Sequence, residues 1–134
     1  MTFCLRQNFK LRKENYKLKD NIVYEKAFKF SINVVNLYKY LSKEKSEYIL
    51  SKQILRSGTS IGANIKEGIE GQSKKDFLSK MNIALKEASE TEYWLELLLA
   101  TKYIDVKLFD SILEDCKELN RILTAIIKTT KNKL

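Results

Sequence analysis

Apolar residues recur at helical spacing along four segments of this chain, and no proline interrupts any of them. A helix that buries one face repeats its apolar residues every three or four positions. Proline would break this pattern, because it lacks the backbone N–H and its ring clashes with the preceding turn. A chain of 134 residues, 44% of them hydrophobic, is also long enough to bury one core. These properties predict a single all-α domain.

The periodicity predicts four helices, at about residues 22–41, 46–70, 74–101 and 106–130. Each begins at or just after a residue that can accept hydrogen bonds from the free N–H groups of a first turn: Asp20 or Asn21, Ser46, Ser73 and Asp105. The connections are short, which favours an antiparallel up-and-down four-helix bundle over residues 22–130. Residues 1–21 are predicted to form a basic N-terminal extension.

The positive charge of the chain gathers at its two ends. The formal net charge is +8 at pH 7, and lysine and arginine outnumber acidic residues in residues 1–21 and again in 117–134. Such an excess attracts polyanions such as nucleic acid, although solvated tails that keep the protein soluble explain it equally well. The candidate nucleic-acid-binding residues are Arg6, Lys10, Arg12, Lys13, Arg121, Lys128 and Lys131.

All four glycines lie within or beside the second predicted helix, in the stretch RSGTSIGANIKEGIEG. Gly58 and Gly62 share the sector of the isoleucines that face the core. A glycine inside a helix costs about 0.8–1 kcal/mol relative to alanine, so we expect close packing to compensate for it. The side chains considered for this space are Phe77, Met81, Tyr38 and Phe109. Gly68 and Gly71 are expected to end the helix in a left-handed conformation. The stretch lacks the Gly-Lys-Ser/Thr of a phosphate-binding P-loop.

The opposite face of the second helix is polar and carries Arg56, Ser60, Asn64 and Glu67. These residues are about one turn apart, so they can form a hydrogen-bonded row along the helix. A solvated face is the simpler interpretation. A surface for a second protein is the alternative, because the row also contains the small residue Ala63.

The third helix has a carboxylate within its core stripe. Glu92 falls among the apolar residues Phe77, Met81, Ala84, Leu85, Ala88, Leu95 and Leu99. A buried carboxylate needs a donor, so we expect Glu92 to meet a tyrosine hydroxyl, Arg56 or Arg121, or to reach the end of the bundle. A structural network explains it better than catalysis, because no second catalytic group is identifiable.

Two helices show more apolar surface than one core can cover. On the first helix, Phe28 and Ile32 belong to a second apolar stripe. On the third, Ile83, Trp94 and Leu97 form a second patch beside Glu90. Exposed patches that include tryptophan are typical of contact sites. The five apolar residues therefore predict the interface of a homo-oligomer.

Several kinds of chemistry have no residues to support them. The chain has no histidine, and its two cysteines, Cys4 and Cys116, are far apart in sequence. We therefore predict no catalytic residue, metal, cofactor or enzymatic activity, with a carboxylate-bound magnesium ion as the alternative. No stretch has the length and hydrophobicity of a membrane span or a signal peptide, and the cysteine usage suits a reducing compartment. We expect a soluble protein of the cytoplasm.

The stretches QILRSGTSIGANIKEG and DFLSKMNIALKEASETEYWLELL, followed by YI, resemble a known family over about residues 22–128. It is the four-helix-bundle family named after proteins encoded in intervening sequences of bacterial 23S rRNA genes. It also contains the accessory variability protein of diversity-generating retroelements. The matching positions are Arg56, Ser60, Ile61, Ala63, Asn64, Ile65, Glu67, Gly68, Phe77, Ala84, Leu85, Glu90, Glu92 and Leu95. The chain departs from the pattern at Lys66, in the short connection IEGQS and in residues 1–21.

The resemblance implies a barrel-shaped homopentamer, and for the retroelement member a basic surface that binds nucleic acid and a reverse transcriptase. We therefore expect a non-enzymatic oligomeric bundle that binds RNA or DNA through basic residues, without reading sequence. The second hypothesis is a protein-interaction scaffold on which the positive charge only steers association. A metal-dependent enzyme is the third.

Overall fold

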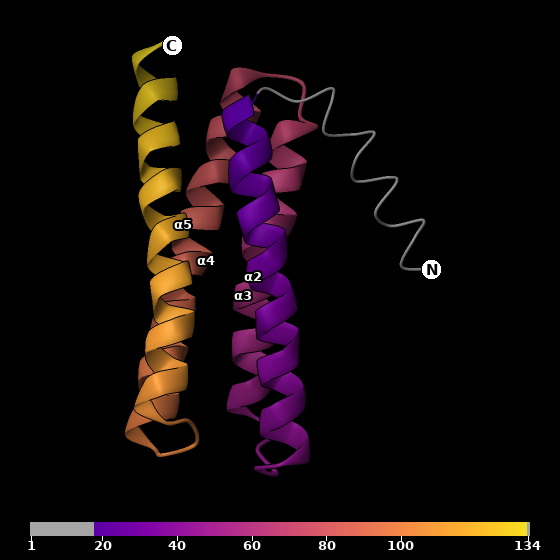
Figure 1. The fold of residues 1–134 in the computed structure, drawn as a ribbon. Helices are drawn as coiled ribbons and strands as arrows, with labels where there is room; N and C mark the ends of the chain where they lie inside the picture. Colours follow the sequence, from indigo (N-terminus) through magenta and orange to yellow (C-terminus); the bar gives the residue numbers. More distant parts are fainter. Residues whose placement is uncertain (1–17, 134) are drawn as a thin grey trace.

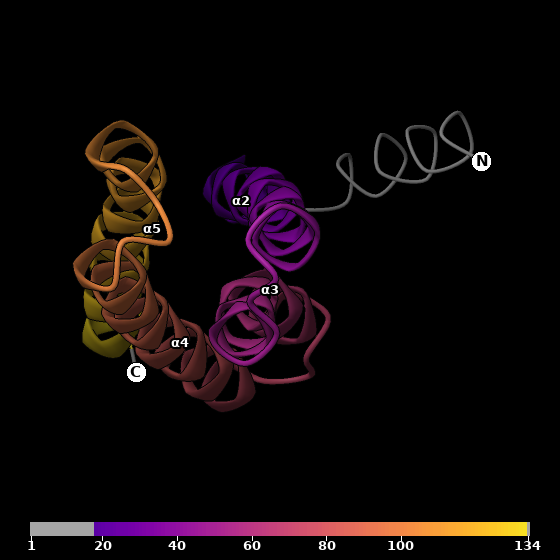
Figure 2. The same cartoon turned by 90° about the horizontal axis from the view of Figure 1, so that it is seen from below.

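The computed structural model describes residues 18–133, and this part of the chain folds into four α-helices. They are α2 (Leu18–Lys43), α3 (Leu50–Ile69), α4 (Lys74–Ala100) and α5 (Val106–Asn132). Each helix runs opposite to the preceding one, and the four follow one another around a shared core in chain order (Figures 1 and 2). The predicted all-α four-helix bundle is confirmed.

Two helices begin at places that the sequence did not indicate. α2 begins at Leu18, inside the predicted extension, so Asp20 and Asn21 lie within the helix and not before it. α3 begins at Leu50 rather than at Ser46. The ends of α4 and α5 lie within two residues of the predicted positions. The apolar period identifies a helix, whereas its first residue depends on how the free N–H groups are satisfied.

The side chain of Glu47 caps the N-terminus of α3. Ser46 adopts a left-handed conformation with φ of 51°. The Glu47 carboxylate accepts hydrogen bonds from the backbone N–H groups of Ile49, Leu50 and Ser51 at 3.2, 3.1 and 2.7 Å. Only 8% of Glu47 is exposed. Burial by itself raises the pKa of this carboxyl, but the three N–H donors favour the charged form, and the resulting pKa lies below the ordinary 4.5.

The predicted caps of α4 and α5 are confirmed. The hydroxyl of Ser73 accepts a hydrogen bond from the N–H of Asp76 at 3.0 Å. The carboxylate of Asp105 accepts one from the N–H of Leu108 at 2.8 Å. Both partners lie three residues away in sequence, and this is the spacing at which a capping side chain reaches the first turn.

The α4–α5 connection reverses at Lys102, which has φ of 67°. Its N–H donates to the Leu99 carbonyl, and the N–H of Tyr103 donates to the Leu98 carbonyl, both at 3.0 Å. This is the Schellman pattern, in which a left-handed residue satisfies the last carbonyls of a helix. Here a lysine occupies the position that glycine favours, so its left-handed backbone carries a strain that glycine would avoid.

Two glycines lie where α3 touches α2. A Cβ on Gly58 would lie 2.8 Å from both methyl carbons of Val34, and one on Gly62 would lie 3.5 Å from Ser31 Oγ and 3.6 Å from Ala27 Cβ. Short α2 side chains thus occupy the space beside both glycines. The prediction that one of four larger side chains fills this space is wrong, because none of them is nearest to either glycine: Phe77, Met81, Tyr38 and Phe109.

Gly68 makes a similar contact on the other side of α3. It is buried within the helix, and a Cβ there would lie 2.7 Å from Met81 Cε and 3.1 Å from Lys80 Cβ of α4. No glycine of the described chain has a positive φ. The prediction that Gly68 and Gly71 reverse the chain in a left-handed conformation is therefore wrong, because α3 ends in a right-handed cap at Glu70.

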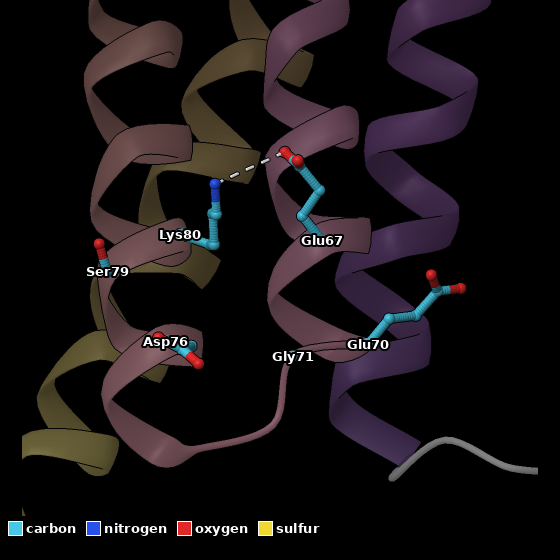
Figure 3. A pocket seen from close by; sticks show the side chains of 6 residues that line it. All are labelled: Glu67, Glu70, Gly71, Asp76, Ser79 and Lys80. Carbon is cyan, nitrogen blue, oxygen red and sulfur yellow. Dashed lines mark ion pairs between the residues drawn. The ribbon is translucent and has the colours of Figure 1, made fainter.

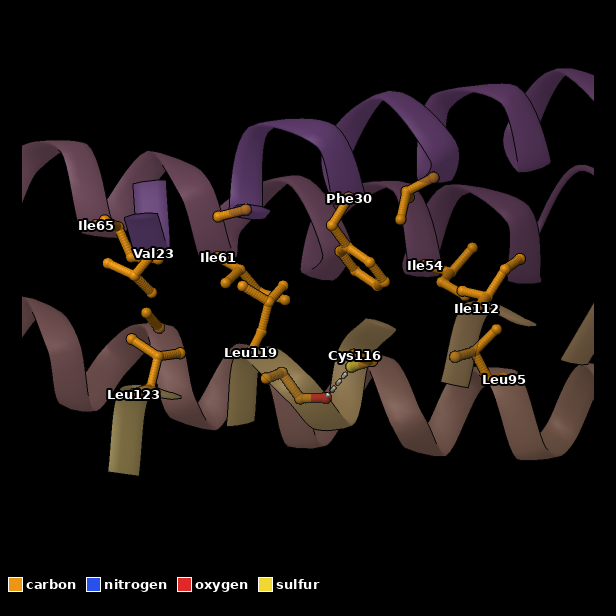
Figure 4. Packing of buried hydrophobic residues seen from close by; sticks show 14 of the residues in the cluster. Val23, Phe30, Ile54, Ile61, Ile65, Leu95, Ile112, Cys116, Leu119 and Leu123 are labelled. Atoms are coloured by element: carbon orange, nitrogen blue, oxygen red, sulfur yellow. Dashed lines mark hydrogen bonds between the residues drawn. The ribbon is translucent and has the colours of Figure 1, made fainter. Parts of the chain in front are cut away.

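One core unites the four helices (Figure 4). Its fully buried large side chains include Phe30, Leu41, Ile54, Ile61, Ile65, Met81, Leu95, Leu98, Leu119 and Leu123. On α4 the buried stripe passes through Leu98, whereas the predicted Leu99 is only partly buried. α2 and α5 contact each other least among neighbouring helices, and the ion pair of Lys26 Nζ with Glu118 Oε1, at 2.8 Å, joins them.

Replacing Gly58 with alanine is expected to lower the free energy of unfolding by about 1 kcal/mol. The methyl group would overlap Val34, and overpacking costs about 1–3 kcal/mol, which exceeds the gain of about 1 kcal/mol in helix propensity. Gly62→Ala is the matched control and should be neutral or stabilising, because its Cβ meets the nearest atom at 3.5 Å. Urea denaturation followed by circular dichroism measures both. The cost of Gly58→Ala should vanish in a Val34→Ala background, and an undiminished cost there would contradict this explanation.

Replacing Glu47 with glutamine is expected to lower the free energy of unfolding by about 1 kcal/mol at pH 7, because the charged acceptor of three N–H groups is lost. The pKa of Glu47 is lowered in the folded state. Its contribution to stability is therefore complete above the unfolded pKa and disappears as the pH falls through the folded pKa. The difference between wild type and variant should shrink below about pH 4.5. Glu44→Gln, at an exposed neighbour, should show no such pH-dependent difference.

Candidate nucleic-acid and partner interfaces

Basic side chains line one face of α5 from the middle of the helix to its C-terminal end. We call this face the α5 basic face, and it consists of Lys117, Arg121, Lys128 and Lys131, all exposed. The turn of about 100° per residue places the four within one narrow sector, on the side of α5 opposite to its buried residues. At 1.5 Å per residue, the face is about 21 Å long. The chain has no acidic residue after Glu118, which pairs with Lys26.

The other candidate nucleic-acid-binding residues lie outside the described part of the chain: Arg6, Lys10, Arg12 and Lys13. The charges of residues 22–116 cancel, so the net charge arises entirely from 1–21 and 117–134. The fold brings the start of α2 and the basic C-terminal end of α5 to the same end of the bundle (Figure 1).

The polar row on α3 is held by bonds between side chains and backbone. The hydroxyl of Ser60 donates to the Arg56 carbonyl at 2.6 Å, and the Asn64 amide donates to the Ser60 carbonyl at 2.8 Å. Glu67 Oε2 lies 3.8 Å from Lys80 Nζ on α4. The row thus forms along one helix, and its polar groups are largely satisfied without a ligand.

The side chain of Arg56 extends from this row to α4 and links α3 to that helix. Its guanidinium pairs with Glu90 and lies 3.4 Å from Glu87 Oε2. The indole N–H of Trp94 donates to the same Glu90 carboxylate at 3.1 Å. Because Arg56 and Glu90 are partly exposed, the ion pair stabilises the fold by no more than about 1 kcal/mol. The main structural consequence of the ion pair is that the Glu90 carboxylate is held where it accepts the hydrogen bond from the Trp94 indole.

Glu92 has a different partner from those expected. It is half-buried on α4, and Asn120 Nδ2 of α5 donates to its Oε1 at 3.4 Å. It does not bond to a tyrosine hydroxyl, Arg56 or Arg121 within the described chain. The sequence could not indicate Asn120 as the partner, because the two residues are 28 positions apart and only the packing of α4 on α5 brings them together.

Thr91, the neighbour of Glu92, is the polar residue of α4 that is buried in the core. Its Oγ1 lies 2.9 Å from Ser57 Oγ of α3 and 2.8 Å from the Glu87 carbonyl oxygen, and both hydroxyl residues are fully buried. This pair was missed because short hydroxyl side chains interrupt an apolar stripe without changing its period. Since Thr91 and Ser57 satisfy each other, the pair is structural and not a binding site.

The predicted interface residues form two separate patches. Phe28 and Ile32 on α2 are 44% and 48% exposed, and Ile83 on α4 is 37% exposed. Trp94 and Leu97 on α4 are half-buried, and Trp94 packs against the core. α3 stands between α2 and α4 in the bundle (Figure 2). The structure therefore presents two different apolar surfaces.

A pocket lies beside the α3–α4 turn (Figure 3). It is lined by Glu67, Glu70, Gly71, Asp76, Ser79 and Lys80. Three of these six residues are acidic, and Lys80 lies close to one of them, Glu67. Within residues 18–133, no group of three or more acidic or cysteine side chains is arranged to hold a metal ion. None of the four described helices combines the length and hydrophobicity of a membrane span.

The described cysteine is an unreactive thiol. Cys116 is buried, and its Sγ lies 3.4 Å from the Ala88 carbonyl oxygen (Figure 4). Burial, with a smaller effect from the nearby Glu92 carboxylate, raises the pKa of Cys116 to about 12. The thiol is therefore protonated at neutral pH, and a protonated thiol is a poor nucleophile. Cys4 lies outside the described residues.

Comparisons with known proteins agree with the resemblance of the motif. Residues 19–125 match the family described as 23S rRNA-intervening sequence protein. A similar solved structure is that of a protein with unknown function from the S23 ribosomal protein family of Bacteroides thetaiotaomicron VPI-5482. It is 57% identical, the alignment covers 83% of this chain and 99% of that chain, and the TM-score is 0.82. No curated protein matches the chain in sequence.

Proposed function

This chain belongs to the family of 23S rRNA-intervening sequence proteins, and we propose that it is a non-enzymatic, homo-oligomeric four-helix bundle that binds RNA or DNA through its basic surface. The α5 basic face is the observation that carries this proposal. Its four cations point away from the core, and three of them follow Glu118, after which this sequence has no acidic residue. Contacts of this kind with phosphates are favourable because they release condensed counterions.

The two apolar patches support assembly into a closed ring. A two-fold dimer buries the same patch on both copies, whereas a head-to-tail interface joins two different patches and closes into a ring. Phe28 and Ile32 of one copy would meet Ile83, Trp94 and Leu97 of the next. The family resemblance suggests five copies. Such a ring would repeat the α5 basic face once per subunit, which strengthens binding to a long polyanion through multivalency.

We propose no catalytic step and no cofactor for this bundle. Support comes from Cys116, whose thiol is neutral, and from Glu87, Glu90 and Glu92 of α4, which contact Arg56, Trp94 or Asn120. The cytoplasm is the proposed location, because a free thiol persists in a reducing compartment.

A protein-interaction scaffold is the second candidate function. The α4 surface favours it, because the Tyr93 side chain is 55% exposed and packs edge-on against Trp94, with ring centroids 4.9 Å apart. Aromatic pairs of this kind are frequent at binding hot spots. The family resemblance makes a reverse transcriptase one partner to test. A complex with a partner that survives nuclease treatment would favour this function over nucleic-acid binding.

The full chain is expected to retain structured RNA in a filter-binding assay at low salt. The logarithm of its affinity should fall linearly with the logarithm of the salt concentration, because each phosphate contact releases counterions. Competitor RNAs of unrelated sequence should displace the labelled RNA equally well, since the basic residues contact phosphates and not bases. Failure to retain any RNA or DNA at low salt would refute nucleic-acid binding.

The double substitution Phe28→Ser and Ile32→Ser is expected to reduce the molar mass measured by light scattering to that of one subunit. Hydrophobic burial drives such assembly at about 25 cal/mol per Å² of apolar surface, and serine removes most of that surface. The matched control is Tyr48→Ser with Val106→Ser, which changes two exposed apolar side chains outside both patches. The control should keep the wild-type mass. A wild-type protein that is already monomeric at micromolar concentration would refute the assembly.

A further inference from the structure

We infer that the α5 basic face binds a double-stranded nucleic acid along the phosphates of its backbone, without contacts to the bases. The inference rests on the proposed function and specifies the class of nucleic acid. It arises from three properties of α5 taken together: the straight array of its cations, the absence of aromatic side chains around them, and the absence of acids that pair with them.

The cations form a rigid row. All four belong to one uninterrupted helix, so their backbone positions are fixed along a line of about 21 Å. A duplex presents one charge per about 1.7 Å of its axis and bends only over about 150 base pairs. Over the length of the row it is therefore a straight rod with about twelve phosphates. A single strand would have to be straightened to meet the same row, and this ordering costs conformational entropy.

The surroundings of the row lack groups that stack on bases. The exposed residues of α5 beside the four cations are Glu114, which lies one turn before Lys117, and Thr124, Ala125, Thr129 and Asn132, none of them aromatic. The exposed aromatic side chains of the described chain are Phe28, Tyr40, Tyr48 and Tyr93, none of which is on α5. Proteins that prefer single strands stack bases on aromatic rings, at about 1–3 kcal/mol per base. The α5 basic face has no such contribution, so phosphate contacts alone decide its ligand.

The four cations are available to a ligand. None of them forms an ion pair with an acid of the described chain. Glu118 is the nearest acid in sequence to Arg121, and it points to the α2 side of the helix, where it pairs with Lys26. An anionic membrane surface is a poorer match, because an interfacial helix needs an apolar face to insert, and the exposed C-terminal half of α5 has no large apolar side chain.

Fluorescence anisotropy with the full chain tests this inference. The probes are a labelled 20-base-pair RNA duplex, the DNA duplex of the same sequence and the labelled single strand of each, from about 50 to 200 mM salt. We expect both duplexes to bind at least tenfold more tightly than the single strands. The variant with Lys117→Gln, Arg121→Gln, Lys128→Gln and Lys131→Gln should lose this preference, and its salt slope should fall by about 4.

The matched control neutralises four exposed lysines elsewhere, namely Lys52, Lys74, Lys75 and Lys86. It changes the net charge by the same amount and should keep the duplex preference. If the α5 variant does not fold by circular dichroism, the single changes Lys117→Gln and Lys128→Gln replace it, each expected to reduce the salt slope by about 1.

The possible failures are distinguishable. Single strands that bind as tightly as duplexes would overturn the inference but leave nucleic-acid binding intact. An α5 variant with wild-type duplex affinity would also overturn it, because the binding surface would then lie elsewhere. Absence of binding to all four probes at low salt would overturn the proposed function together with the inference.

Discussion

The close approach of α2 to α3 is the contact on which the rest of the bundle depends. Gly58 leaves room for Val34, and Gly62 leaves room for Ala27 and Ser31, so the two helices meet over small side chains. A methyl group at Gly58 would already be too close. Because this contact uses the inner face of α2, Phe28 and Ile32 of that helix remain outside the core.

α3 is the centre of the fold, since it contacts α2 through one set of glycines and α4 through another. Gly68 admits Met81, and the hydroxyls of Ser57 and Thr91 meet where α3 and α4 pack. Arg56 pairs with Glu90 across the same contact, so this residue of the motif has a structural role. α5 is the last of the four helices around the core, and it contacts α2 less than the other neighbouring helices contact each other. A broad face of α5 is therefore exposed, and this face carries the cations.

In this arrangement, different helices carry the exposed apolar side chains and the exposed cations. α2 and α4 carry apolar patches on different sides, and α5 carries cations on a face turned away from the core. The proposed assembly and the proposed nucleic-acid binding therefore use different surfaces. The residues proposed for assembly lie on α2 and α4, and none of them belongs to the α5 basic face.

The sequence alone determined the four helices, the faces that they bury and the caps Ser73 and Asp105, because these depend on residues within one or two turns of each other. It did not determine which helix each buried face meets. Val34 as the neighbour of Gly58, and Asn120 as the partner of Glu92, became evident only in the folded chain. A helical period reports the direction of a side chain relative to its own axis. The partner it finds there depends on the relative rotation and height of two helices, which tertiary packing decides.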